Sequence, residues 1–585
     1  MDRIELENKL ETLAKGGITT KTIRSPKGFT YTYKVLQWRE NGKQKSRVLK
    51  DDEIPLIEAQ LKEREQIEKE LNSLPKIIKQ SFQTYTTVVY GDALKGYVLT
   101  AKSYKKRKIF GKLKDYIYND VFGKVFILYG LRRTGKTTMI RQVILDMNDQ
   151  DFKKTVFIQI TNKNTIAELN KDLRTLLQHG FKYVFIDEVT LLEDFIEGGA
   201  LLADIYSMSG MKIVLSGTDS LGFMISKSNE LYDRCVLLHS TFIPYREFDE
   251  ILELSGIDNY IEYGGTMSLS GTYYNDGLFV DNEKTDQYID TAIANNIQHS
   301  LKNYQYGGHF RALYDLYKKN ELTSAINRVI EDMNHDFTVD VLERDFKSND
   351  LRISANNLRR DLKNPLTILD EIDIKLFTQR LKELLSIKNK DKQTIKLEDY
   401  HVLEIQEYLQ ELDLIDEIEI KDTEAPSKML KRIVFTQPGL RYSQARCLID
   451  SLNQDNQFGE MTDNNKKFVI ERILNEIKGR MMEDMVLLET KIAKPNCKVF
   501  KLEFKFGEFD MVVKNPDEGT IEIYEIKHSD KIVADQAKHL RDEEKCELAQ
   551  YRYGNISKKG VLYRGENTFV DGIEYINVEK YLKSL

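Results

Sequence analysis

The chain has 585 residues, 41% of them hydrophobic and 31% charged, with a formal net charge of -6 at pH 7, so its length and composition predict a multidomain α/β protein. No apolar run approaches the roughly 18 residues needed to cross a bilayer, and the first residues lack a signal-peptide pattern, so we expect a cytoplasmic protein without a membrane partner. The four cysteines form no CxxC pair and the eight histidines do not cluster with them, which disfavours zinc and disulfide frameworks.

Residues 1–75 are expected to form a basic β-hairpin followed by a helix. Positions 15 to 50 hold ten Lys or Arg residues and one acid, Glu40. Aromatic-rich strands flank a predicted turn at Asn41-Gly42, and a charged helix is expected at 52–73. Basic side chains interleaved with aromatic ones suit DNA, with RNA not excluded, whereas the alternative is a solvated sheet whose aromatics pack on its own helix.

The segment KVFILYGLRRTGKTTMIRQVILDM, within an expected core at 76–250, predicts a strand, a phosphate-binding loop and a helix. Glycines let backbone N–H groups turn toward phosphates, and the helix N-terminus adds partial positive charge. Lys136 is expected to contact the β and γ phosphates of ATP, and Thr137 to bind Mg²⁺. The predicted loop residues are Gly130, Arg132, Arg133, Thr134, Gly135, Lys136, Thr137 and Thr138. A basic cluster at 102–114, just before this loop, is either a second phosphate contact or an exposed helix face.

Apolar strands at 155–160, 183–189 and 212–218 fit the same parallel sheet. Asp187 follows four apolar residues, so we expect it at the carboxyl end of a buried strand, where it can hold Mg²⁺ opposite Thr137. Glu188 is the candidate to orient and deprotonate the attacking water. Ser216 or Thr218 is expected either to sense the γ phosphate or to cap its strand.

The motifs GLRRTGKTT, VFIDEV, IVLSGTDS and IPYREF together resemble the archaeal-type branch of the AAA+ P-loop ATPases. This resemblance implies Mg²⁺-dependent ATP hydrolysis. It also matches Arg234 to an arginine that reaches a nucleotide in cis or from a neighbouring subunit of an oligomer; an ordinary salt bridge is the alternative. The chain departs from many relatives in lacking a Pro after Gly264-Gly265.

Residues 251–395 show chiefly helical periodicity and are interpreted as a lid or spacer. Residues 396–455 predict a helix followed by a β-hairpin with a turn at 424–426, a plan similar to a winged helix. Such modules bind DNA or dock proteins, and the sequence does not decide between them.

Residues 456–585 predict a long helix, three strands and another helix. Glu525 and Lys527 are two positions apart on a strand and therefore share a face, and Asp510 lies on the preceding strand. The carboxylates are expected to hold a second Mg²⁺ or Mn²⁺ while Lys527 orients a metal-bound water for attack on a phosphodiester. Cross-strand ion pairs are the alternative.

The whole stretch resembles the PD-(D/E)XK nuclease fold, and this resemblance adds Glu483 as a carboxylate of the first helix. Phe509 stands where the namesake Pro is expected. The resulting hypothesis is ATP hydrolysis coupled to nucleic-acid binding and metal-dependent cleavage. The alternative is an ATP-dependent switch or defence-type sensor that docks protein partners and keeps an inactive nuclease-like scaffold.

Overall fold

The computed structural model describes residues 9, 13–24, 30–40, 43–73, 82–192, 195, 199–218, 231, 233–265, 289, 293, 310–345, 383, 397–428, 430–452 and 463–585. These residues divide into two compact units, Met1–Gln83 and Thr84–Leu585. Most of the expected lid at 251–395 lies outside the described residues. Within the described part of the chain, no helix has both the length and the apolar character that a membrane crossing requires.

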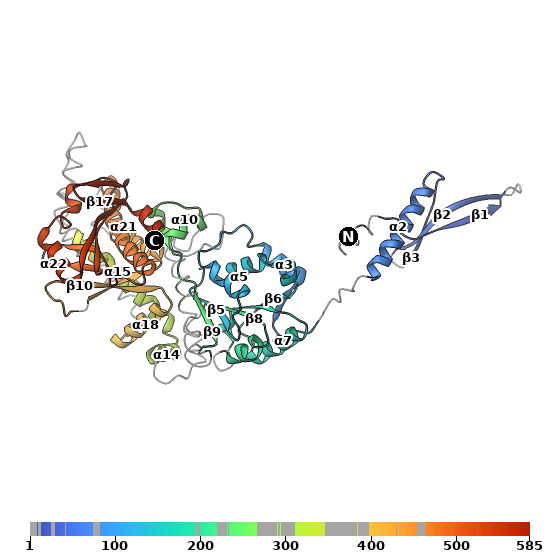
Figure 1. Ribbon diagram of the computed structural model, residues 1–585, viewed down its shortest axis with the longest axis horizontal. Helices are drawn as coiled ribbons and strands as arrows, with labels where there is room; N and C mark the ends of the chain where they lie inside the picture. Colours follow the sequence, from blue (N-terminus) through green and yellow to red (C-terminus); the bar gives the residue numbers. More distant parts are fainter. Residues whose placement is uncertain are drawn as a thin grey trace. The chain divides into compact units, whose positions relative to one another are not determined.

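The first unit is an antiparallel sheet with one long helix (Figure 1). Its elements are β1 (Gly17–Arg24), β2 (Thr30–Glu40), β3 (Lys43–Val48) and α2 (Ile54–Ser73). Lys34 of β2 forms an ion pair with Glu58 of α2 at 2.8 Å, while Val35 and Leu36 are buried. Strands β2 and β3 and helix α2 lie where the hairpin and the helix were expected, β1 was not expected, and the turn at Asn41-Gly42 lies outside the described residues.

The second unit begins with a six-stranded sheet in the order β4-β6-β7-β8-β5-β9, in which only β4 runs antiparallel. Its strands are β4 (Thr87–Tyr90), β5 (Val125–Tyr129), β6 (Thr155–Gln159), β7 (Tyr183–Asp187), β8 (Lys212–Gly217) and β9 (Cys235–His239). The helices α3 (Gly91–Leu99), α4 (Phe110–Tyr118), α5 (Lys136–Leu145), α6 (Asp149–Phe152) and α7 (Ile166–Gln178) accompany it. The near-continuous apolar runs of β5 and β7 are typical of parallel strands buried on both faces. Strands β4 and β9 were not expected from the sequence.

A second sheet of eight strands has the order β11-β10-β12-β13-β14-β15-β17-β16. Its strands are β10 (Ile415–Asp422), β11 (Leu430–Phe435), β12 (Lys498–Glu503), β13 (Glu508–Asn515), β14 (Thr520–Lys527), β15 (Asn555–Tyr563), β16 (Thr568–Val570) and β17 (Ile573–Asn577). The hairpin β10–β11, expected as the wing of a separate module, joins this sheet because β10 pairs in parallel with β12. The expected boundary at 455 therefore separates elements that share one sheet.

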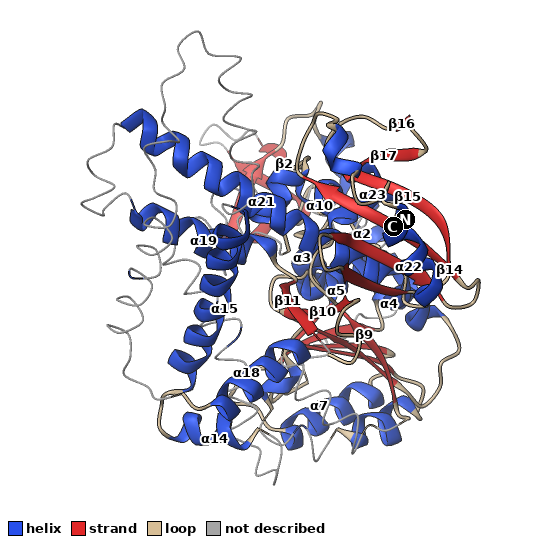
Figure 2. Cartoon of the chain, turned by 90° about the vertical axis from the view of Figure 1, so that its left-hand side faces the viewer, coloured by secondary structure: helices blue, strands red, loops and turns tan. Residues whose placement is uncertain are grey.

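Helices complete the second unit. They are α10 (Tyr245–Leu252), α11 (Ile257–Tyr263), α14 (Arg311–Lys318), α15 (Leu322–Asp345), α18 (Asp399–Glu411), α19 (Pro438–Leu452), α21 (Asp463–Ala493), α22 (Glu543–Tyr553) and α23 (Val578–Ser584). Helices α15, α19 and α21 lie side by side (Figure 2). Tyr245 and Phe248 of α10 share one hydrophobic core with α21 and the eight-stranded sheet. Helix α10 is therefore packed as part of the C-terminal half of the unit.

Candidate nucleotide site and a second charged centre

The predicted phosphate-binding loop connects β5 to α5, as the sequence indicated. Gly130 has φ 135°, and a Cβ there would lie 2.4 Å from the carbonyl oxygen of Ser240, so only glycine fits. Gly135 has φ 88° and directly precedes the first residue of α5. The loop thus presents the N-terminus of a ten-residue helix, the arrangement that binds phosphate.

Lys136 is buried, and its ammonium donates to the carbonyl oxygens of Gly130 at 2.8 Å and Leu131 at 2.7 Å. Burial lowers the pKa of Lys136 to about 8, although the nearby carboxylates of Glu188 and Asp187 oppose this shift. Lys136 therefore bonds to two residues of its own loop, and phosphate oxygens would replace the two carbonyls as partners of its ammonium.

Asp187 ends β7 and is fully partnered by groups from three elements. Its Oδ2 accepts the hydroxyl of Thr137 at 2.8 Å, and its Oδ1 accepts the backbone N–H of Glu188 at 3.1 Å and the hydroxyl of Ser216. These contacts bring the loop, β7 and β8 together at the carboxyl edge of the sheet. A carboxylate and a hydroxyl in contact are suitable ligands for Mg²⁺ or its water shell.

Glu188 is half-buried and adopts φ 56°, a left-handed conformation that is uncommon for a glutamate. The Thr218 hydroxyl donates to its Oε2 at 3.3 Å. Burial, followed by the charge of Asp187, raises the pKa of Glu188, while Lys136 and Arg132 act in the opposite direction. A carboxylate with a raised pKa is a better proton acceptor, which suits the role of general base.

The other loop residues differ in how they are placed. Thr134 is buried; its hydroxyl donates to the carbonyl of Leu131 at 2.9 Å and lies 3.0 Å from the Ser240 hydroxyl. Arg132, Arg133 and Thr138 are half-buried, and Arg133 adopts φ 64°. Thr134 therefore shapes the loop from within, and the other three side chains stay accessible to solvent.

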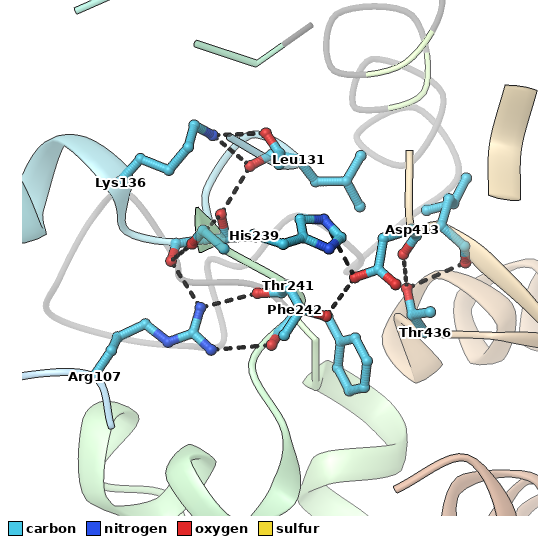
Figure 3. Close-up of polar contacts among 12 residues, drawn as sticks. Arg107, Leu131, Lys136, His239, Thr241, Phe242, Asp413 and Thr436 are labelled. Carbon is cyan, nitrogen blue, oxygen red and sulfur yellow. Dashed lines mark hydrogen bonds and ion pairs between the residues drawn. The ribbon is translucent and has the colours of Figure 1, made fainter. Parts of the chain in front are cut away.

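Arg107, from the basic cluster at 102–114, was not predicted as a site residue. Figure 3 shows its guanidinium beneath the loop, where it donates to the carbonyl of Thr134 at 3.0 Å and that of Thr241 at 2.9 Å. Its buried partner is Glu247, at 2.8 Å. Nothing in the run of Lys and Arg around it signals burial, because all its partners are far away in sequence.

His239 and Asp413 meet beside the same loop and were also missed. The His239 ring stacks on Tyr129 with centroids 4.8 Å apart, and its Nε2 lies 3.9 Å from Oδ2 of Asp413 (Figure 3). Burial, then the charges of Lys136 and Arg107, lower the pKa of His239 to about 4, so the ring is neutral near pH 7. Asp413 also accepts the hydroxyl of Thr241, which follows β9.

Arg234 directly precedes β9, at the amino end of the parallel strands, whereas the phosphate-binding loop lies at their carboxyl end. Its Nε donates to Asp204 Oδ1 at 2.8 Å, and both side chains are exposed. The structure therefore does not bring Arg234 to the loop of its own chain.

The second charged centre lies on β13 and β14 of the eight-stranded sheet. The ammonium of Lys527 is 2.8 Å from Oδ2 of Asp510 and 2.8 Å from Oε2 of Glu525. Asp510 also accepts the backbone N–H of Ile526 at 2.8 Å. The structure thus brings together the three residues that the sequence assigned to this centre.

The two carboxylates of this centre have opposite pKa shifts. Burial opposes ionisation of Asp510, but Lys527 and Lys501 overcome it and hold its pKa well below the usual range. Burial and the charge of Asp510 raise the pKa of Glu525, whose Oε1 is buried without a hydrogen-bond partner. Glu483, the fourth predicted residue, pairs with Arg480 at 2.7 Å, and its charge, after those of Asp510 and Glu525, also raises the pKa of Lys527.

The parallel sheet, the loop with Lys136 and the Thr137–Asp187 contact are features that a P-loop domain combines. Residues 123–251 match the family model of an AAA domain, in agreement with the AAA+ class expected for this part of the chain. No curated protein sequence matches the chain.

The solved structures that overlap parts of the chain include the following three. The Aeropyrum pernix ORC2 protein in ADPNP and ADP complexes is 13% identical, with coverage of 64% of this chain and 97% of that one and a TM-score of 0.27. The Aeropyrum pernix ORC1 protein in complex with DNA is 12% identical, with 59% and 92% covered and a TM-score of 0.20. Cdc6p from Pyrobaculum aerophilum is 14% identical, with 63% and 100% covered and a TM-score of 0.22. At such scores nothing about function follows from them.

Proposed function

We propose that the chain binds ATP with Mg²⁺ and hydrolyses it. The observation that carries this proposal is the 2.8 Å contact between Thr137 and Asp187, since it joins a loop hydroxyl to a strand-end carboxylate beside the buried Lys136. Mg²⁺ bound through these two residues would neutralise phosphate charge. Lys136 would hold the β and γ phosphates, and Glu188 would orient the water and accept its proton.

ATP hydrolysis by the full-length chain with Mg²⁺ tests this proposal. Lys136→Ala should abolish both tight nucleotide binding and turnover, because it removes the ammonium that would hold the β and γ phosphates. Lys95→Ala, at an exposed lysine on α3 of the same domain, is the control and should leave both unchanged. Equal turnover by Lys136→Ala and the wild type would reject the proposal.

We also propose that the first unit binds nucleic acid. Lys21 and Arg24 of β1 and Lys45 of β3 are exposed, and so is Tyr31, at 61%. Exposed cations beside an exposed aromatic ring can contact phosphates and stack on a base. This exposure favours the DNA-binding hypothesis over the alternative, in which the aromatic side chains of the sheet all pack on its own helix.

A salt titration tests this assignment. Each phosphate contact that is lost should reduce the slope of log affinity against log salt by about 0.9 for duplex DNA and about 0.7 for single strands. The double variant Lys21→Ser/Arg24→Ser should therefore bind DNA more weakly, with a shallower slope. Lys62→Ser/Lys69→Ser, on the exposed side of α2, is the control. Unchanged binding in the β1 variant would exclude β1 as the contact.

Metal-dependent cleavage at Asp510, Glu525 and Lys527 is the second activity that we propose. The unpartnered Oε1 of Glu525, buried beside a second carboxylate, is the observation that favours a bound cation. Asp510 and Glu525 would hold Mg²⁺ or Mn²⁺, and such an ion supplies an activated water at neutral pH. Lys527 contacts both carboxylates and would orient that water.

The alternative function is an ATP-dependent switch or sensor that docks protein partners and keeps this centre as a scaffold. Two observations favour it: Glu483 pairs with Arg480, and within the described ranges no three His, Cys, Asp or Glu side chains gather as a metal site. Incubation with single- and double-stranded DNA and RNA, with Mg²⁺ or Mn²⁺ and with or without ATP, decides between them. Cutting by the wild type that is lost in Asp510→Asn supports the nuclease, and no cutting by either protein supports the scaffold.

A further inference from the structure

Arg107 lies in the loop between α3 and α4 and is only 2% exposed. Its Nε donates to Glu247 at 2.8 Å, its Nη1 to the carbonyls of Thr134 at 3.0 Å and Thr241 at 2.9 Å, and its Nη2 to the carbonyl of Phe242 at 3.2 Å. One planar guanidinium thus meets four acceptors in three separate segments of the chain, and Figure 3 shows the three backbone carbonyls among them.

The segments that Arg107 joins belong to different parts of the unit. Thr134 is in the phosphate-binding loop, two residues before Lys136. Glu247 is on α10, which packs in the core of the C-terminal half, and the backbone N–H of Tyr245 at the start of α10 donates to Glu489 of α21 at 2.6 Å. Arg107 therefore connects the loop that meets phosphate to a helix of the other half.

Stability alone does not explain this arrangement, because a buried ion pair contributes little over a well-packed apolar pair. Geometry explains it better: a lysine could pair with Glu247, but its single ammonium lacks the flat, multiply donating shape that reaches three backbone carbonyls. The segment 241–242 is held from its other side by Asp413, which accepts the Thr241 hydroxyl. Leu131 of the loop also packs, at 1% exposure, with α14, α15 and α18.

We propose that Arg107 is a positioning residue that fixes the phosphate-binding loop and links the state of that loop to α10. The inference rests on the proposed ATP binding. When phosphate draws Lys136 away from the carbonyls of Gly130 and Leu131, the loop rearranges around Thr134. Because Thr134 and Glu247 share one guanidinium, the rearrangement is transmitted to α10 and from there to α21.

The test compares Arg107→Lys with the wild type in full-length protein, using the fluorescent analogue mant-ATP and Mg²⁺. Two quantities are measured: the dissociation constant, and hydrogen exchange of the α10 amides with and without nucleotide. We expect Arg107→Lys to weaken mant-ATP binding by about tenfold, a loss of loop preorganisation, and to abolish the nucleotide-dependent change in α10. If Arg107 only stabilised the fold, Arg107→Lys would lower the melting temperature and leave the nucleotide-dependent change in α10 intact.

Arg441→Lys is the matched control, since Arg441 is also a buried arginine paired with a carboxylate, Asp484, at 3.1 Å. It should lower stability comparably while keeping mant-ATP affinity and the α10 response. If Arg107→Lys does not fold, Glu247→Gln takes its place. The glutamine keeps the shape of the side chain that Arg107 contacts on α10 but removes its charge, so the nucleotide-dependent change in α10 exchange should be smaller.

Three outcomes are informative. Affinity within twofold of the wild type and an intact α10 response in Arg107→Lys would overturn the inference, as would an unaltered response in Glu247→Gln. A wild-type chain that fails to bind mant-ATP would instead reject the proposed ATP binding, and the inference would fall with it.

Discussion

The nucleotide site and the centre on β13 and β14 both bury a pair of carboxylates, but they partner these groups differently. At the nucleotide site, Asp187 receives two hydroxyls and one backbone N–H, and Thr218 donates to Glu188. At the second centre, Lys527 serves both Asp510 and Glu525, and one oxygen of Glu525 has no partner.

This difference bears on what each site needs from a ligand. Neutral donors hold Asp187 in place without a cation, so this carboxylate and the Thr137 hydroxyl are positioned before nucleotide arrives. A buried oxygen without a partner costs about 1–3 kcal/mol, more when it is charged. The second centre therefore gains stability from anything that supplies positive charge or a proton to Glu525.

Glu188→Gln tests the first half of the comparison and should have the largest effect. Gln keeps the shape and the Thr218 contact but cannot accept a proton, so turnover should fall by roughly 10² to 10⁴ while ATP stays bound. Single-turnover hydrolysis and nucleotide retention after gel filtration measure the two quantities. Normal turnover in this variant would remove Glu188 from the catalytic role.

Divalent metal tests the second half. Mn²⁺ at about 100 times its dissociation constant should stabilise the wild type by about 2.7 kcal/mol, measured by urea unfolding without nucleotide. Glu525→Gln should lose this gain, and without metal it should be at least as stable as the wild type because a neutral amide avoids a second buried carboxylate beside Asp510.

The control for this measurement is Glu522→Gln on the same strand, which pairs with Lys494 at 3.2 Å and should keep the metal effect. Equal metal stabilisation in the wild type and Glu525→Gln would show that the cation binds elsewhere.

A pH series sharpens the account of the nucleotide site. Only the charged form of Lys136 attracts phosphate, and burial lowers its pKa to about 8, so the ammonium is lost as pH rises through this value. Affinity for ATP should then fall by about tenfold between pH 7 and pH 9. Calorimetry in buffers of different ionisation enthalpy should show proton uptake on binding at pH 9; a flat affinity profile would contradict the assignment.

Asp413→Asn should have the smallest effect. Burial, with a contribution from Asp416, raises the pKa of Asp413 to about 7, so its favourable contribution to folding is present at low pH and is lost as pH rises through about 7. Asn mimics the neutral form and tolerates the left-handed φ of 64°.

The side chain is 22% exposed, so the gain should be modest, roughly 1–2 kcal/mol in the free energy of unfolding at pH 8 and near zero at about pH 3.5, below the unfolded pKa of about 3.9. Urea unfolding at the two pH values measures it. A gain of the same size at both would assign the effect to backbone conformation rather than to charge.

The sequence allowed the loop and the contact between Thr137 and Asp187 to be expected because their signals are local. A strand, a glycine-rich loop and a helix are adjacent in the chain, and Asp187 directly follows four apolar residues. The same holds for Lys527 and Glu525, whose spacing puts them on one face of a strand. Their contact with Asp510 follows from a short hairpin between neighbouring strands.

What the sequence could not reveal depends on contacts between distant segments. Arg107 is one of several cations in a row, and among the groups that it contacts in the interior are Thr241 and Glu247, more than a hundred positions away. The pairing of β10 with β12 spans about eighty residues and has no turn to announce it. Glu483 was placed by resemblance, and Arg480, three positions before it on the same face of α21, pairs with it at 2.7 Å.

The pairing of β10 with β12 also limits how the chain can be dissected. A fragment beginning at 456 would lack β10 and β11 and leave the backbone groups of β12 without their neighbour. Exposed strand edges recruit other strands and promote aggregation. A fragment intended for expression of the C-terminal centre should therefore start before α18, so that the sheet keeps its outermost hairpin.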